Sequence, residues 1–317
     1  MNRNEYAVAH AQYIQSLPSK KKASNTLSTY DLALRKFADF LKRTEQQGDI
    51  TPIDIVNFRT DLFASGIKTN TIRQYLINLH TFFGWCCRMK KVKENPVMVE
   101  ELPKSERIEY DLLDNEQIDK ALTVTPSGIF SKTAPRNRAL IVLLLQTGMR
   151  SSEIRALKPS DLDFDGCTIK VRHGKGDKYR EVAFPSLSRQ LVEEYLNSGI
   201  RPLHLTDNDW LFGNDTDEHG HSTNGNIWHQ FSSCGLLQLT RRYIAHCTGK
   251  DNGVGVHSLR HSFTALADDA GVPIRVVQQA LGHSSVQLTE NTYSYILRRS
   301  KNAETINEAF DRQFATI

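Results

Sequence analysis

Residues 140–153 read LIVLLLQTGMRSSE. The six consecutive apolar residues Leu140–Leu145 predict a strongly apolar helix, and Gly148 is its expected end, because glycine adopts the left-handed conformation that follows many helices. An N-cap at Asp114 opens an earlier helix. This pattern predicts the helical beginning of the larger of two domains.

The turn after Gly148 carries the first candidate site residue, Arg150. This residue directly precedes a helix that is expected to begin near Ser151 or Ser152, and the free amides of a first helical turn favour an anion. Glu153 lies in the same turn. It is a candidate for orienting Arg150, although a role as a partner of the helix dipole explains it equally well.

Downstream, a β-hairpin or meander is predicted between Asp165 and Pro185. Apolar and polar residues alternate there, as they do in strands with one buried face. The apolar positions are Cys167, Ile169, Val171, Val182 and Phe184. Lys175 lies between two glycines at the expected tip, which makes it a candidate for a flexible basic arm.

Upstream, apolar residues recur at helical spacing in three stretches. They are Leu27, Tyr30, Leu34, Phe37, Phe40 and Leu41, then Ile53, Val56, Phe58 and Leu62, then Ile72, Leu76, Leu79, Phe82, Phe83 and Trp85. Thr51-Pro52 begins the second helix, and Thr69 or Asn70 is expected to cap the third. The aromatic residues are interpreted as helix-packing core rather than as a platform for stacking bases. We therefore expect a helical domain at residues 26–98.

The segments on either side of this domain have a different character. Residues 1–25 lack sustained periodicity and include a run of lysines, so they are predicted to form a mobile lead-in. Prolines interrupt the helical pattern near residue 100, and an interdomain linker is placed at residues 99–110. The second domain is expected at 111–297, and a C-terminal helix at 298–317.

The charge of the chain is unevenly distributed. The 317 residues are enough for two domains with cores, and the net charge is +4. The first 104 residues hold 16 basic against 10 acidic residues, and the remainder holds 24 against 26. The basic excess lies where sequence-independent contact with phosphates is expected, although a solvated lysine-rich surface explains it equally well.

Cysteine usage and hydropathy exclude several classes of protein. The five cysteines form no CxxC pair, and their odd number fits reduced thiols in a cytosol. The sequence shows no signal pattern and no apolar run long enough to cross a bilayer. The histidines and cysteines of residues 219–247 lack the tight pairs of a zinc site. We expect a cytoplasmic protein without membrane contact and without a bound metal.

Further polar residues lie in short motifs nearer the end of the chain. His257 and Arg260 belong to the segment HSLRH, His283 follows a Leu-Gly pair, and Tyr293 ends an Asn-Thr-Tyr triplet. His257, Arg260 and Thr264 are predicted to lie on one side of a helix, away from its core stripe. That stripe consists of Leu259, Phe263, Leu266 and Ala270. Each motif alone is a weak signal, and their order and spacing make the set specific.

The whole set resembles the tyrosine recombinase (phage integrase) family, in its Xer-like form without an arm-binding domain. Its members are Arg150, Lys175, His257 with Arg260, His283 and Tyr293. The resemblance extends from about Leu27 to Tyr293. It implies a mainly α fold with a small antiparallel β-sheet (α+β), in which a helical, SAM-like core-binding domain and an integrase-type catalytic domain close on a duplex as a clamp.

The resemblance also implies a mechanism. Attack on a phosphodiester passes through a pentacoordinate state with additional negative charge, and Arg150 and Arg260 stabilise that charge with paired hydrogen bonds. Tyr293 is the implied nucleophile, which forms a 3′-phosphotyrosine and frees a 5′ hydroxyl without a metal or nucleotide cofactor. Lys175 is the implied general acid, and Lys178 is its nearest competitor.

The remaining positions are two histidines and a rival tyrosine. His257 is expected to exchange a proton near the nucleophile, and His283 to bind the phosphate or orient the arginines. Tyr293 lies ten residues after His283, one more than is usual in the family. Tyr295 is therefore a rival nucleophile, although the local context of Tyr293 matches the family better.

The expected function is site-specific DNA recombination, by integration, excision, inversion or resolution. Expected partners are double-stranded DNA with paired half-sites and further copies of the chain, which form a tetramer on two DNA sites through the amphipathic tail 298–317. Packing of this tail on its own domain is the alternative. The sequence does not specify the target site, nor whether an accessory DNA-bending protein or a partner recombinase takes part.

Two other functions are compatible with the same motifs. A type IB topoisomerase shares the chemistry but relaxes supercoils without pairing two sites. A DNA-binding accessory protein with a silent active site is disfavoured, because all the catalytic positions are filled.

Overall fold

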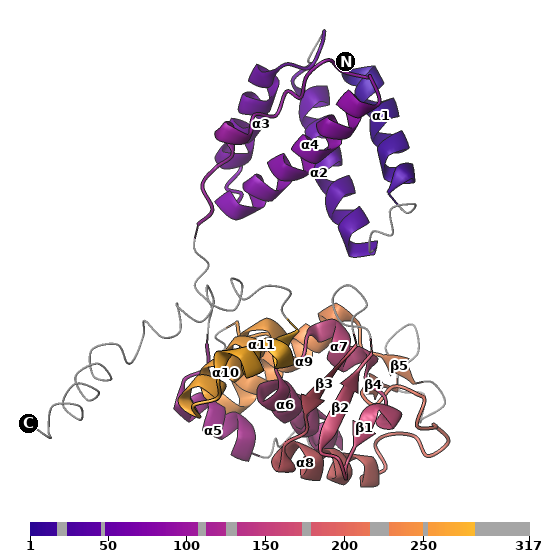
Figure 1. Ribbon diagram of the computed structural model, residues 1–317, viewed down its shortest axis with the longest axis vertical. Helices are drawn as coiled ribbons and strands as arrows, with labels where there is room; N and C mark the ends of the chain where they lie inside the picture. Colours follow the sequence, from indigo (N-terminus) through magenta and orange to yellow (C-terminus); the bar gives the residue numbers. More distant parts are fainter. Residues whose placement is uncertain are drawn as a thin grey trace, which may run out of the picture. The chain divides into compact units, whose positions relative to one another are not determined.

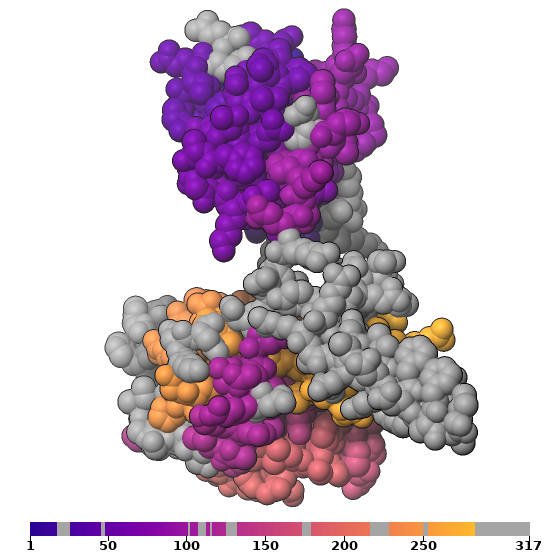
Figure 2. Space-filling model, turned by 90° about the vertical axis from the view of Figure 1, so that its left-hand side faces the viewer, coloured from indigo at the N-terminus to yellow at the C-terminus, as the bar shows by residue number. Residues whose placement is uncertain are grey.

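The computed structural model describes residues 1–17, 24–45, 48–106, 112–124, 132–172, 179–215, 228–249 and 253–282. The chain forms two compact units, Met1–Glu109 and Tyr110–Ile317 (Figure 1). Figure 2 shows the described residues of both units as a space-filling view, coloured by residue number as in Figure 1. The division between the units falls within the predicted linker, residues 99–110.

The N-terminal unit is a bundle of four helices around an aromatic core. The helices are α1 (Arg3–Ser16), α2 (Ser24–Arg43), α3 (Pro52–Ala64) and α4 (Thr69–Arg88). Phe37, Phe82 and Phe83 are fully buried, and the first two contact the ring of Tyr6 edge to face at 5.4 and 5.3 Å. Such contacts add to the free energy gained from burying apolar area. The interpretation of the aromatic stripe as packing core is confirmed.

The predicted mobile lead-in at residues 1–25 is wrong for helix α1. Asn2 caps this helix, and the side chain of Glu5 completes the capping box. Tyr6, Ala9 and Tyr13 are buried at a spacing of three and four residues. Ala7, Val8 and Ala11 are apolar but exposed, so the apolar residues of this helix form no clear stripe in the sequence. The capping box was the better signal.

The beginning of the predicted linker belongs to the N-terminal unit. Helix α4 has Lys68 at its N-cap, so the prediction that Thr69 or Asn70 caps it is wrong. Those two side chains instead bind Glu106: Thr69 donates to its carboxylate at 2.6 Å, and Asn70 donates to its carbonyl oxygen at 2.8 Å. Arg73 donates to the carbonyl oxygen of Pro103 at 2.7 Å. The chain is therefore held along α4 as far as residue 106.

The second unit surrounds helix α6 (Ala134–Thr147), which packs against the four helices α5, α8, α9 and α10. The other helices are α5 (Asn115–Thr123), α7 (Ser151–Ala156), α8 (Ser186–Asn197), α9 (Ser233–Thr248), α10 (Val256–Asp269) and α11 (Ile274–Leu281). Residues 139–145 of α6 are all buried, which explains why their sequence is apolar throughout. Among the described helices, none combines the length and apolarity that crossing a membrane requires.

The predicted hairpin is part of a three-stranded antiparallel sheet. Its strands are β1 (Leu162–Asp163), β2 (Thr168–Val171) and β3 (Arg180–Ala183), in that order. Ile169 pairs with Val182, and both are buried, as the alternation predicted. A second sheet contains β4 (Gly213–Asn214) and β5 (His229–Gln230). The predicted hairpin tip, with Lys175, lies outside the described residues.

Gly148 ends helix α6 in a left-handed conformation, with φ of 60°. A Cβ atom at this position would lie 2.4 Å from Cδ1 of Phe263 and 2.8 Å from Cδ2 of Leu281. Helices α10 and α11 therefore come close to the turn that holds Arg150. The glycine is required both by its backbone conformation and by the lack of space for a side chain.

We expect Gly148→Ala to lower the free energy of unfolding by about 2–5 kcal/mol, from left-handed strain and overpacking together. The matched control is Gly271→Ala, because Gly271 has φ of 70° but nothing within 4 Å of its Cβ position. The control should lose only about 1–2 kcal/mol from backbone strain. Urea unfolding measures both variants. Equal losses would show that Phe263 and Leu281 move aside without cost.

Candidate active site

Arg150 lies in the turn between α6 and α7, and its guanidinium is held from two sides. Its Nη1 donates to Oε1 of Glu153 at 2.8 Å, and its Nη2 donates to the carbonyl oxygen of Gly282 at 2.9 Å. The backbone amide of Arg150 donates to the other oxygen of Glu153, also at 2.8 Å. Of the two roles considered for Glu153, orientation of Arg150 is therefore confirmed. A glutamate at the third helical position bonds back to the residue before the helix, as in a capping box.

Arg260 is buried in α10, with 5% of its surface exposed. Its Nη1 donates to the carbonyl oxygen of Gly148, and its Nη2 donates to that of Leu281 at 2.6 Å. The prediction that Arg260 and Thr264 point away from the core is wrong, since both are buried, and Ala270 is exposed. Helix α10 packs against α6, α9 and α11, so it is covered on more than one side.

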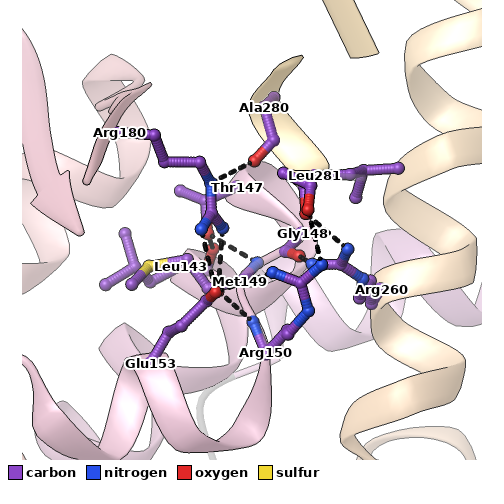
Figure 3. A network of polar contacts seen from close by, with 11 residues as sticks. Leu143, Thr147, Gly148, Met149, Arg150, Glu153, Arg180, Arg260, Ala280 and Leu281 are labelled. Carbon is purple, nitrogen blue, oxygen red and sulfur yellow. Dashed lines mark hydrogen bonds and ion pairs between the residues drawn. The ribbon is translucent and has the colours of Figure 1, made fainter. Parts of the chain in front are cut away.

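Figure 3 shows the guanidinium groups of Arg150 and Arg260 side by side, next to Gly148 and close to Leu281, the last residue of α11. A guanidinium carries five N–H donors. In the part of the chain that is described, the side-chain bonds of each arginine use two of its nitrogens. Each therefore keeps donors for an anion, while the bonds to protein oxygens hold its plane in place.

Glu153 stays ionised in this cluster, although its side chain is 1% exposed. Burial alone would raise the pKa of the carboxyl, but hydrogen bonds from Arg180 and then Arg150 outweigh burial and lower the pKa to about 2. Burial, followed by the charge of Arg150, lowers the pKa of Arg260 to about 9, so Arg260 is still a cation at neutral pH. Arg150 and Arg180 bond this carboxylate, and the charge of Arg260 acts on it as well. Three guanidinium groups around one carboxylate leave the cluster with a net positive charge, which attracts anions.

His257 lies in the first turn of α10 and keeps solvent exposure. The ring of His261 packs against its ring at 5.3 Å and nearly at right angles. Partial desolvation, and then the positive charges of Arg260 and Arg150, lower the pKa of His257 below its ordinary value. The ring is therefore neutral at pH 7 and able to accept a proton.

The structure thus brings together three of the six predicted site residues, Arg150, His257 and Arg260. The other three, Lys175, His283 and Tyr293, lie outside the described residues. Described residues lie next to two of these three in the chain, because β2 and β3 flank the segment with Lys175, and Gly282 directly precedes His283.

Sequence reasoning missed one member of the cluster, Arg180. Its guanidinium bonds both carboxylate oxygens of Glu153 at 2.8 Å. Arg180 precedes the buried Val182 by two residues in β3, so it continues the alternation on the same face of the strand. The signal that could have revealed Arg180 in the sequence is a positively charged residue at a position that the alternation assigns to the buried face of the strand.

Family models match both units of the chain. Residues 111–298 match the model of the phage integrase family, and residues 11–90 match that of the phage integrase N-terminal SAM-like domain. The chain belongs to the phage integrase family. It is a tyrosine-type site-specific DNA recombinase, as the relatives below support.

Two relatives named tyrosine recombinase XerC illustrate the similarity. That of Oceanobacillus iheyensis is 30% identical over 292 residues, which cover 90% of each chain. That of Bacillus licheniformis is 29% identical over 300 residues, which cover 93% of each chain. The comparison therefore spans both units of the recombinase rather than the catalytic unit alone.

Solved structures agree on the fold. The XerH recombinase bound to palindromic difH substrate has a TM-score of 0.70 at 24% identity, over 92% of this chain and 81% of that one. A lambda integrase dimer bound to a core site has a TM-score of 0.69 at 16% identity, over 96% and 97%. The predicted fold class, mainly helical with small antiparallel sheets, is confirmed.

Proposed function

We propose that this recombinase cuts and rejoins duplex DNA at paired half-sites, and that Arg150 and Arg260 hold the scissile phosphate. The observation that carries the assignment is the pair of buried or half-buried guanidinium groups, which are fixed by protein oxygens and keep donors for an anion. Two such groups match the paired oxygens of a phosphate, whose negative charge increases as the nucleophile attacks.

In this proposal the oxygen of Tyr293 attacks the phosphorus, and the bond from phosphorus to the 5′ oxygen breaks. Lys175 gives its proton to that oxygen, which leaves as a hydroxyl. His257, neutral at pH 7, accepts the proton of the tyrosine, and His283 binds the phosphate. The phosphotyrosine conserves the bond energy, so that a 5′ hydroxyl from a second site can reverse the reaction and complete strand exchange. Since its substrate is DNA, we place the recombinase in the cytoplasm.

Parallel assays separate this function from a type IB topoisomerase and from a silent DNA-binding protein. One assay measures relaxation of a supercoiled plasmid without a second site, and the other measures recombination between two copies of a site. The DNA recovered with the protein from cells supplies that site. Recombination between two sites supports the proposal. Relaxation without recombination would favour the topoisomerase, and DNA binding without cleavage would favour the silent protein.

We further propose that the tail 298–317 docks on a neighbouring copy and joins four copies on two sites. Deletion of residues 302–317 should leave binding to one half-site unchanged, because the apolar core that the described residues form in the catalytic unit, from Leu113 to Leu281, is kept. Cooperative filling of two half-sites should fall, and strand exchange with it. Gel-shift titration on one and on two half-sites measures this. Unchanged cooperativity would show that the tail packs on its own domain.

A further inference from the structure

Arg180 is bound to protein oxygens along its whole guanidinium. Its side chain is 13% exposed. Nη1 and Nη2 donate to the two oxygens of Glu153, each at 2.8 Å, and Nε donates to the carbonyl oxygen of Ala280 at 2.9 Å (Figure 3). This two-pronged geometry fixes both the position and the plane of a carboxylate, which a lysine cannot do.

The carboxylate that Arg180 fixes is the one that holds Arg150. Each oxygen of Glu153 accepts one bond from Arg180 and one from Arg150. A carboxylate has about four such acceptor positions, so all of them are used. If Arg180 were absent, Glu153 would retain only the bonds from Arg150 and would be free to rotate with it.

Arg180 also joins segments that lie next to two other predicted site residues in the chain. The carbonyl oxygens of Ala280, Leu281 and Gly282 accept, in that order, from Arg180, Arg260 and Arg150. The C-terminal end of α11 is thus bound by three arginines. Since Arg180 begins β3, it connects the hairpin that carries Lys175 to the end of the helix that precedes His283.

We infer that Arg180 is a positioning residue for strand cleavage: it fixes the ionised Glu153, and through it the guanidinium of Arg150, against the end of α11. Arg180 does not itself contact the phosphate in this proposal. The inference rests on the proposed role of Arg150. Removal of Arg180 should therefore slow the chemical step and leave DNA affinity nearly unchanged, because the affinity is spread over many phosphate contacts.

The variant Arg180→Met tests the inference in single-turnover cleavage of a nicked suicide substrate from pH 5 to 9. Its rate at pH 7.5 should fall by about 10- to 100-fold, since a displacement of about 1 Å at a reacting group costs that order of rate. Gel-shift titration of the same substrate should give a nearly unchanged Kd. Arg180→Lys, which reaches one oxygen only, should recover part of the rate.

The pH profile is the readout that a purely structural role would not change. In the natural chain the pKa of Glu153 is about 2, so this group does not titrate between pH 5 and 9. Without Arg180, the effect of burial is less opposed and the pKa of Glu153 rises, so that cleavage should fall as the pH decreases. In a plot of cleavage rate against pH, the fall toward acid pH (the acid limb) should therefore be steeper in Arg180→Met, or begin at a higher pH, than in the natural chain.

Other charged groups near Glu153 need to be distinguished from it. Arg150 lies in the same turn as Glu153, and Arg260 lies on α10. Glu153 also lines a pocket whose other charged residues are Lys158, Asp161, Lys170 and Arg172. The pKa of His257 lies below its ordinary value, so this ring also gains its proton on the acid side of neutrality. The double variant Arg180→Met with Glu153→Gln separates them, because glutamine does not titrate. It should lose the new acid limb while any limb from His257 remains.

The matched control is Arg136→Met. Arg136 is also a buried arginine of the catalytic unit, with 7% exposure, and it donates to Asn137 and to the carbonyl oxygen of Gly213. Its removal should lower the melting temperature without creating an acid limb. If Arg180→Met and Arg180→Lys cleave at the natural rate with the natural pH profile, Arg180 stabilises the fold only and does not position Arg150 for cleavage. If Arg150→Ala also cleaves normally, the phosphate-binding role of Arg150 is wrong, independently of Arg180.

Discussion

Tyr293→Phe is expected to abolish the covalent adduct between protein and DNA completely while leaving DNA binding intact. Only the nucleophilic oxygen is removed, and no other group of the proposed site replaces it. A phenol with a pKa of about 10 is mostly neutral at pH 7, so its reactivity depends on the cationic site that surrounds the phosphate. Denaturing gels with a nicked suicide substrate detect the adduct, and a gel shift measures binding.

The matched control is Tyr295→Phe, which removes the rival phenol two residues later. It should form the adduct at nearly the natural rate. An adduct that persists in Tyr293→Phe and vanishes in Tyr295→Phe would transfer the role of nucleophile to Tyr295. The nucleophile would then lie twelve residues after His283, further from the family's usual spacing.

Lys175→Ala and Arg150→Ala should both slow cleavage of an ordinary phosphodiester, but only one should recover on a sulfur substrate. A 5′-bridging phosphorothiolate releases a thiolate, which needs no proton, so Lys175→Ala should regain most of the natural rate. Arg150→Ala loses charge stabilisation instead. It should remain slower by at least about 10²- to 10³-fold, the usual effect of one lost donor to a transition-state anion.

Quenched single-turnover cleavage of the two substrates measures these rates. Lys178→Ala is the control for the second lysine of the same segment, and it should cleave both substrates normally. If Lys175→Ala fails equally on oxygen and sulfur, Lys175 is not the general acid. If Lys178→Ala shows the sulfur-specific recovery instead, the role belongs to Lys178.

The cluster around Glu153 shows which contacts the local sequence predicts and which it does not. Glu153 lies three residues from Arg150, within one helical turn, so the orientation of Arg150 was available as a hypothesis. Arg180 is 27 residues from Glu153 and 100 from Ala280. Strand alternation placed Val182 on the buried face, but it does not indicate which carboxylate a cation on that face reaches.

The burial of Arg260 is a second example. A helical projection separates polar from apolar sides, and it assumes that the polar side faces solvent. Helix α10 instead has neighbours on more than one side, and the carbonyl oxygens of Gly148 and Leu281 accept hydrogen bonds from the buried guanidinium. These bonds replace part of the water contacts that the guanidinium loses on burial, and its other donors stay available for an anion.

By itself, the sequence determined the helices α2 to α7 and α10, the hairpin strands and the order of the candidate catalytic motifs. Periodicity, helix caps and glycine stops express contacts within a few residues. Only the tertiary structure decided that α1 belongs to the N-terminal core and that Arg150, Arg180 and Arg260 meet at the end of α11. Arg150 and Gly282 are 132 residues apart, and Arg260 and Gly148 are 112 apart. Contacts at such separations depend on how whole helices and strands pack, and no local pattern specifies them.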